Sequence, residues 1–265
     1  SGLVGSEMCI RDRIYDAEFD VEELVVGGAP GSQVGVLTGQ LTREVVDIRV
    51  TTIDNVSTIV YDLESSGVFN YNGPTIVASG FNVGGDLEVA LEMDEVIRAS
   101  DLSQITYDMY LDVDFNNIGF PASLVVGSSL DLATLSIDTD YSPPKEIYDF
   151  PLNVGEIWDT ETTTSTSRSG EVYDNLFDLP EDSSESTTER FEIVGSGDPG
   201  VVYSGCSNSY NVTAFNSTSG AINGYRWWCD NAGNDAWWHQ TIDVGADIDF
   251  KLNQYNPVSR VHEIE

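Results

Sequence analysis

Positive charge is scarce in this chain. Its 265 residues carry 11 Lys and Arg against 45 Asp and Glu, a formal net charge of −34, and Lys145 and Lys251 are its only lysines. Phosphate groups are bound through basic patches, so the charge excludes nucleic acid as a partner and disfavours an anionic membrane surface. An acidic surface is typical of exposed, saline surroundings, and calcium binding by the carboxylates is the alternative interpretation.

Long apolar runs are also absent. No stretch approaches the roughly 20 apolar residues of a membrane span, so we expect no membrane-spanning segment. Apolar residues still make up 40% of the chain and aromatic residues 10%, which is enough for packed cores.

Cysteine is limited to Cys9, Cys206 and Cys229. There is no Cys-x-x-Cys motif and the only histidines are His239 and His262, so the chain offers no recognisable zinc site. A disulfide between Cys206 and Cys229 would contribute about 3 to 3.5 kcal/mol in the chain-entropy model. We predict this disulfide, with two buried free thiols as the alternative.

Catalytic signatures are missing as well: there is no G-x-S-x-G elbow, Walker loop, H-E-x-x-H motif or dinucleotide fingerprint. His239 follows a Trp pair on a predicted strand and His262 stands in the polar tail, so neither indicates a catalytic triad. Glycoside hydrolysis uses paired carboxylates, but 45 acids offer too many pairs for one to be informative. We therefore predict a non-catalytic protein and name no catalytic residue.

Alternation of apolar and polar residues is what the chain has in abundance. Segments 87–94, 107–115 and 246–253 place apolar residues at every second position, mostly with acids between them. Side chains on a strand point to opposite faces in turn, so each segment has one apolar and one wet face. The sequence therefore predicts an all-β protein built from antiparallel sheets.

A domain boundary is indicated at Ser142-Pro143-Pro144-Lys145, because two prolines favour an extended linker and remove two ladder donors. We predict two antiparallel domains, each a β-sandwich or a curved half-barrel, over residues 14–142 and 143–257, with a tail at 258–265. One continuous β-structure is the alternative. Within the second domain, Thr160–Thr166 favours an exposed strand, and the polar stretch Leu179–Thr188 favours a mobile loop.

The first residues resemble something other than natural protein. The string LVGSEMCIRDR at residues 3–13 resembles the translation of a transposase sequencing adapter of the Nextera type. This resemblance implies that residues 1–13 are an artefact of the kind that enters metagenomic sequences. It also implies that the native start is missing and that only Cys206 and Cys229 are native cysteines.

One acidic stretch begins like a calcium loop. Asp112-Val113-Asp114-Phe115-Asn116-Asn117 places oxygen ligands at the first, third and fifth positions of an EF-hand. Asn117 then stands where glycine is required, and Ser123 stands where the bidentate Glu belongs. We interpret the aspartates as the wet face of a strand and predict no metal site and no cofactor, with incidental surface calcium as the alternative.

The most informative region is a predicted hairpin over residues 225–238. Its two Trp pairs, Trp227-Trp228 and Trp237-Trp238, flank a polar turn. In the symmetric register, Trp228 opposes Trp237 and Trp227 opposes Trp238, so one cross-strand pair belongs to each face. One pair can anchor a core, and the other, with Tyr225, is a candidate ligand-binding platform. All four rings being structural is the alternative.

A second resemblance covers residues 145–255. The string Phe150-Pro151-Leu152-Asn153-Val154-Gly155-Glu156-Ile157-Trp158, followed by the aromatic doublet Trp227-Trp228 and a Gly233-Asn234 turn, resembles uncharacterised secreted and lipid-anchored β-proteins. Some of these have half-barrel sheets similar to lipoprotein carriers. The resemblance implies a curved antiparallel sheet whose concave face holds an apolar ligand.

Three N-glycosylation sequons, beginning at Asn55, Asn211 and Asn216, favour an extracytoplasmic location together with the lysine scarcity. We predict a secreted or cell-surface protein of the cell envelope whose role is to bind an apolar or carbohydrate ligand. A structural spacer that contacts neighbouring domains of a larger surface protein is one alternative. A secreted hydrolase with paired carboxylates is the other.

Overall fold

The computed structural model describes residues 12–21, 35–71, 77–78, 81–82, 85–120, 123–173, 181–217, 219–242 and 246–256. Its strands are β1 (Asp12–Val21), β2 (Gly35–Ile53), β3 (Val56–Tyr71), β4 (Val77–Ala78), β5 (Phe81–Asn82), β6 (Asp86–Arg98), β7 (Gln104–Asn116), β8 (Ser129–Lys145), β9 (Ile157–Val172), β10 (Ser183–Gly197), β11 (Ser209–Asn216), β12 (Ile222–Cys229), β13 (Asn234–Ile242) and β14 (Ala246–Asn256). A short helix, α1 (Ser123–Val126), precedes β8, and a 3-10 turn (Ser204–Cys206) precedes β11.

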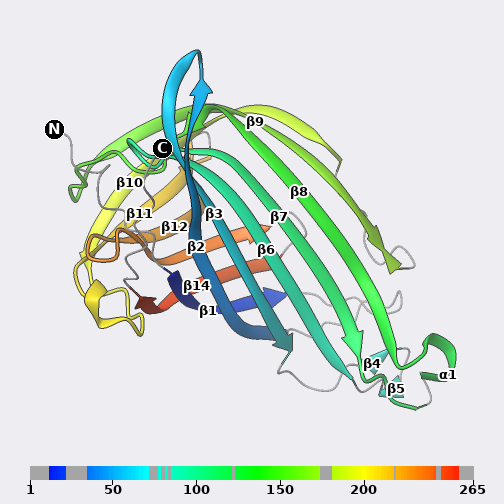
Figure 1. Ribbon diagram of the computed structural model, residues 1–265. Helices are drawn as coiled ribbons and strands as arrows, with labels where there is room; N and C mark the ends of the chain where they lie inside the picture. Colours follow the sequence, from blue (N-terminus) through cyan, green and yellow to red (C-terminus); the bar gives the residue numbers. More distant parts are fainter. Residues whose placement is uncertain are drawn as a thin grey trace.

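Twelve of these strands close into one antiparallel barrel, in the order β1-β14-β13-β12-β11-β10-β9-β8-β7-β6-β3-β2. The strands β4 and β5 pair separately. The long strands β2, β3 and β6 to β9 run along one side of the barrel, and the shorter strands β11 to β14 and β1 lie on the other (Figure 1). The predicted all-β class with antiparallel pairing is confirmed.

The predicted alternation determines which side of the wall each residue faces. Along β6, Leu87, Leu91 and Met93 are buried, while Glu92 and Asp94 are exposed. Because successive side chains point to opposite faces, the apolar set fills the barrel and the acids cover its outside. The large negative charge is therefore carried mainly by the outer surface.

Two groups of buried side chains fill most of the interior. The first gathers around Tyr15, Phe69, Leu91, Trp238 and Phe250. The second gathers around Tyr61, Ile97, Tyr148, Phe191 and Trp228. Both groups draw members from strands before and after residue 143, so the two halves of the chain share their cores.

The predicted division into two domains is therefore wrong, and the single β-structure is correct. Ser142 and Lys145 both belong to β8, which pairs with β7 on one side and β9 on the other. Pro143 and Pro144 lie where the β7–β8 register shifts, between the partners of Gln104 and Thr106. A proline at such an irregularity removes no ladder hydrogen bond, so the strand passes through the predicted linker.

The threonine-rich segment 160–166 forms part of β9, so the predicted strand is confirmed. It is exposed on one face only, because Thr160, Thr162 and Thr166 are buried. The predicted loop at Leu179–Thr188 is wrong from Ser183 onward, because residues 183–192 pair with β9 in a regular antiparallel ladder. Residues 179 and 180 lie outside the described part of the chain. This stretch is polar because both of its faces meet polar surroundings, so its composition resembles that of a loop.

Candidate binding cavity

The Trp hairpin forms, but its register differs from the symmetric one. Trp227 opposes Trp237, while Trp228 opposes Asp235 across a β-bulge. The extra residue on β13 shifts the pairing by one position, as a bulge does. The predicted cross-strand partners are therefore wrong. Trp228 and Trp238 are buried, while Trp227 and Trp237 are half-buried, and Trp227 packs against the first core group.

The two inward Trp rings belong to the packed core. The Trp228 ring lies 4.9 Å from Tyr148 and 5.2 Å from Phe150, measured between ring centroids. The Trp238 ring lies 4.7 Å from Tyr15 and 4.3 Å from Phe250. These rings anchor the two core groups, as aromatic side chains commonly do.

The side chains on the outer face of the hairpin contact one another, and we call Tyr225, Trp237, His239, Asp249 and Lys251 the outer Trp cluster. Asp249 Oδ1 accepts hydrogen bonds from Trp237 Nε1 at 2.8 Å and from Tyr225 Oη at 3.3 Å. Lys251 Nζ lies 4.9 Å from the centroid of the Trp237 ring, and His239 stacks on Tyr225 at 5.2 Å. Because these neighbours occupy the ring faces, the cluster offers less open aromatic surface than a sugar-stacking platform needs.

An open cavity lies inside the barrel beside the hairpin, and Tyr225 and His239 of the hairpin also border its first lobe. It has two lobes, of about 160 Å³ and about 320 Å³. The first lobe is lined by residues that include Gln104, Phe191, Val212, Ala214, Gly224 and Arg226. The second is lined by residues that include Met109, Thr139, Thr164, Thr166, Arg168, Ser183, Glu185 and Thr187. Four residues line both lobes: Tyr107, Tyr141, Lys145 and Glu189.

Small and polar inward side chains leave this space open. Ala214 on β11 opposes Gly224 on β12 beside the first lobe, where larger side chains would fill it. In the second lobe, Thr164 of β9 opposes Glu185 of β10. Deeper on β9, the Thr162 hydroxyl donates to the carbonyl of Pro143 at 2.6 Å. The wall of the second lobe thus presents hydroxyl and carboxylate groups where β6 presents aliphatic ones.

An ion pair stands where the lobes meet. Lys145 Nζ lies 2.5 Å from Glu189 Oε2, and Asn223 Nδ2 donates to Glu189 Oε1 at 3.2 Å. Burial alone would raise the pKa of Glu189, but the charge and hydrogen bond of Lys145, helped by Asn223 and Arg226, hold that pKa below its ordinary value. Glu189 is therefore ionised at neutral pH, and the pair is neutral as a whole.

Below the first lobe, two further ion pairs lie in the interior of the barrel. Arg43 Nη2 lies 2.6 Å from Glu95 Oε2, and Gln104 Nε2 donates to Glu95 Oε1 at 2.9 Å. Arg226 Nη1 lies 3.2 Å from Asp235 Oδ2. These pairs neutralise the buried charges, which would otherwise be costly in a low-dielectric interior.

Two tyrosines complete this buried network. The Tyr148 hydroxyl donates to Asp235 Oδ1, and the Tyr15 hydroxyl donates to the Asp235 carbonyl at 3.1 Å. Burial, followed by the nearby Asp235 carboxylate, raises the pKa of Tyr148 well above its ordinary value. Burial also raises the pKa of Tyr15 to about 12. Both hydroxyls therefore stay protonated and act as hydrogen-bond donors rather than as acid–base groups.

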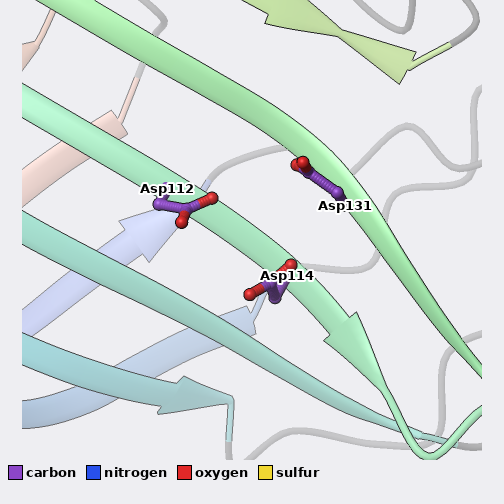
Figure 2. A group of neighbouring side chains, drawn as sticks. All are labelled: Asp112, Asp114 and Asp131. Carbon is purple, nitrogen blue, oxygen red and sulfur yellow. The ribbon is translucent and has the colours of Figure 1, made fainter.

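The predicted acidic strand carries a cluster of carboxylates on its outer face. Figure 2 shows Asp112 and Asp114 on β7 beside Asp131 on β8. One oxygen from each lies within 4.8 Å of the others. Burial, then the charges of Asp114 and Asp131, raise the pKa of Asp112. Exposed acidic groups are often close together without holding an ion, so we assign no metal site.

The predicted disulfide between Cys206 and Cys229 is confirmed, with the two Cα atoms 5.3 Å apart. It joins the 3-10 turn before β11 to the end of β12, near the Trp hairpin. The Asn231 side chain in the hairpin turn adds a hydrogen bond to the carbonyl of Gly205 at 2.7 Å. Together these contacts fix the connection that precedes β11 against the barrel.

Tyr225 is the one predicted binding residue that lines the cavity, at its first lobe, and sequence reasoning missed the other lining residues. In the sequence, Tyr107 and Tyr141 are indistinguishable from other residues of alternating strands, and Glu189 is one of 45 acidic residues. The one signal that could have found the site is scarcity, because Lys145 is one of only two lysines. The adjacent prolines Pro143 and Pro144 conceal this signal, because they also indicate a linker.

No protein-family model, no curated protein and no solved structure matches this chain. Among the residues that the structure describes, no helix is long and apolar enough to cross a membrane.

Proposed function

We propose that this chain is a non-catalytic module that works outside the cytoplasm and binds a carbohydrate inside its barrel. The observation that carries the proposal is the lining of the open cavity. Tyrosine rings, serine and threonine hydroxyls and the Lys145–Glu189 pair surround it. Such a lining offers both donors and acceptors, as the hydroxyl groups of a sugar require.

The positions of the apolar and polar side chains inside the barrel give less support to an apolar ligand. The apolar inward side chains of β6 and its neighbours pack against one another in the core, with Leu91 and Phe69 fully buried. Phe191, Val212 and Ala214 give the first lobe an apolar part, but this lobe measures only about 160 Å³. A larger apolar ligand would extend into the second lobe, beside Thr164, Thr187 and Glu185. Burying these polar groups against hydrocarbon leaves their hydrogen bonds unmade.

The cavity carboxylates also favour binding over hydrolysis. A glycosidase needs one carboxylic acid with a raised pKa to protonate the leaving group. Glu189 has a lowered pKa because Lys145 holds its charge, and Glu95 and Asp235 are each paired with an arginine. These carboxylates are suited to accept hydrogen bonds rather than to give a proton.

The extracytoplasmic part of the proposal has separate support. Disulfides persist in oxidising compartments, and Cys206 pairs with Cys229. Asn55, the first residue of a sequon, lies exposed in the turn between β2 and β3, where a glycan could be attached. The acidic outer surface suits a protein that must stay dissolved at the cell surface or beyond it.

A binding screen tests the proposal. We expect the chain to bind members of a glycan array and none of a panel of fatty acids and phospholipids. The variant Lys145→Met should weaken glycan binding about tenfold or more, because a hydrogen bond to a charged group is lost from the cavity. Isothermal titration calorimetry measures the effect, and thermal unfolding checks that the variant is folded.

The chain offers a matched control in its only other lysine. Lys251 lies on the outer face over Trp237, so Lys251→Met should leave the affinity unchanged if the cavity is the site. Loss of binding in Lys251→Met alone would move the site to the outer Trp cluster. Lipid binding without glycan binding would restore the apolar ligand, no binding would favour a spacer, and release of reducing sugar would favour a hydrolase.

A further inference from the structure

The two lobes of the cavity form one continuous space. Tyr107, Tyr141, Lys145 and Glu189 belong to the walls of both, so the lobes meet at these four residues. The second lobe, of about 320 Å³, reaches the lower bound of about 300 Å³ for ligand pockets, while the first is about 160 Å³. The space is therefore elongated, with a narrow end near Ala214 and a wider end along β9 and β10.

The junction of the lobes places a charged hydrogen-bond donor beside a charged acceptor. The Lys145 ammonium is a donor and the Glu189 carboxylate is an acceptor, and their charged atoms lie 2.5 Å apart. Adjacent hydroxyl groups on a sugar ring each donate and accept, so one can receive from Lys145 while the other donates to Glu189. The pair can thus be bridged by a ligand that carries no charge.

An acidic sugar would meet an unfavourable potential in the same place. Glu185 and Glu189 both line the second lobe, and each lysine or arginine charge that a uronate carboxylate could meet at the junction is already balanced by a carboxylate. The surrounding chain carries a net charge of −34, which lowers the local concentration of anions. Arg168 lines the second lobe outside the junction, where its guanidinium donates to the Glu181 carbonyl and the Ser183 hydroxyl. The junction, rather than the whole cavity, therefore disfavours a negative charge on the ligand.

Taking the proposed carbohydrate binding as its basis, we propose that the cavity binds a neutral, linear oligosaccharide of at least two units. One unit occupies the narrow first lobe and the next lies along the threonine-rich wall of the second. The bond between the units passes the Lys145–Glu189 pair, which fixes the position of the chain.

Calorimetric titration with oligosaccharides of increasing length tests this proposal. The probes are cello-, malto- and manno-oligosaccharides of one to five units, with oligogalacturonates of the same lengths as the acidic series. We expect the affinity for one neutral series to rise about tenfold between one unit and two or three, and then to level off when both lobes are filled. The oligogalacturonates should bind at least about tenfold more weakly.

Variants in one lobe at a time show whether the two lobes act together. Thr187→Val removes a hydroxyl that lines the second lobe only, and Ala214→Leu fills part of the first lobe only. Each should reduce the gain in affinity from added units by about 3-fold to 10-fold, the scale of one hydrogen bond or one lost contact. Thr188→Val is the matched control, because the neighbouring residue on β10 points to the outer face.

The outcomes separate this proposal from the one on which it rests. If the chain binds no carbohydrate at all, the proposed function fails. If the affinity is the same for one unit as for five, or if oligogalacturonates bind more tightly than the neutral series, carbohydrate binding stands and the two-lobe proposal is overturned. An equal loss in Thr187→Val and Thr188→Val would also overturn it, because the effect would then be unrelated to the cavity.

Discussion

The barrel wall has two regions that follow the same alternation with different inward residues. On β6 the inward positions are aliphatic, with Leu87, Leu91 and Met93 all buried. On β9 the inward positions are threonines, such as Thr164 and Thr166, beside the open second lobe. Their outward positions are polar in both cases.

The difference explains where the cavity lies. Aliphatic side chains from facing strands interdigitate, because leaving a void between them loses contacts and costs free energy. Threonine is shorter and carries a hydroxyl that stays hydrogen-bonded to water or to a ligand, so a threonine wall has less reason to collapse. One barrel thus combines a filled half, which supplies stability, with an open half, which supplies a binding surface.

The largest expected effect concerns the buried pair where these halves meet. Asp235→Ala leaves Arg226 and the Tyr148 hydroxyl without their shared partner. We expect the free energy of unfolding to fall by about 3 to 5 kcal/mol, as when one member of a buried ion pair is removed. Urea denaturation followed by tryptophan fluorescence measures it.

Asp249→Ala is the control for this change, because Asp249 is also an aspartate that accepts hydrogen bonds but lies on the outer face. Its loss removes two partly exposed hydrogen bonds and should cost about 1 to 2 kcal/mol, less than the loss of the buried Asp235. Equal losses in the two variants would show that the inner network is not more important for stability than the outer one.

A direct comparison of the two walls gives the next largest effect. Leu91→Ala removes a fully buried aliphatic side chain and should lower the free energy of unfolding by about 2 to 5 kcal/mol. Thr164→Ala, at an inward position of the open wall, should change it by less than about 1 kcal/mol. Chemical denaturation of both variants is the measurement. Similar losses would contradict the division into a filled and an open half.

The sequence could predict much of this wall and little of the cavity. The alternation at residues 87–94 and 107–115 is a local signal, and it correctly indicates strands, their antiparallel class and their wet faces. The role of Pro143 could not be inferred, because a proline in a linker and a proline at a register shift look alike until the partner strands are known.

The cavity escaped prediction for a related reason. Tyr107, Lys145 and Glu189 come from three strands, and only the register of the closed barrel brings them together. The Trp hairpin shows the same limit on a smaller scale, because a one-residue bulge beside Trp228 changed every predicted partner. Local pattern predicts which face a side chain takes, whereas the site depends on register.

The smallest expected effect concerns the outer face, where the strands β7 and β9 differ in how their acids are paired. On β7, Asp108 stands between Asp94 and Asp138 in the ladder. Burial, followed by the charge of Asp138, raises the pKa of Asp108. On β9, hydrogen bonds from Arg190 lower the pKa of Asp159. The two aspartates should therefore have opposite effects on stability.

The native state holds a proton on Asp108 more tightly than the unfolded chain does, so its favourable contribution is complete below about pH 4, the ordinary value for Asp, and is lost as pH rises through the raised native value. Asp108→Asn should therefore stabilise the protein at pH 7 by about 0.5 kcal/mol or less and give no gain near pH 3. Asp159→Asn should destabilise it at pH 7, because the contribution of a lowered pKa is present at neutral pH and is lost as pH falls. Thermal unfolding at both pH values, with and without added salt, measures these changes. A stabilised Asp159→Asn, or a gain for Asp108→Asn that persists at pH 3 or does not shrink with salt, would show that charge pairing does not distinguish the outer faces of β7 and β9.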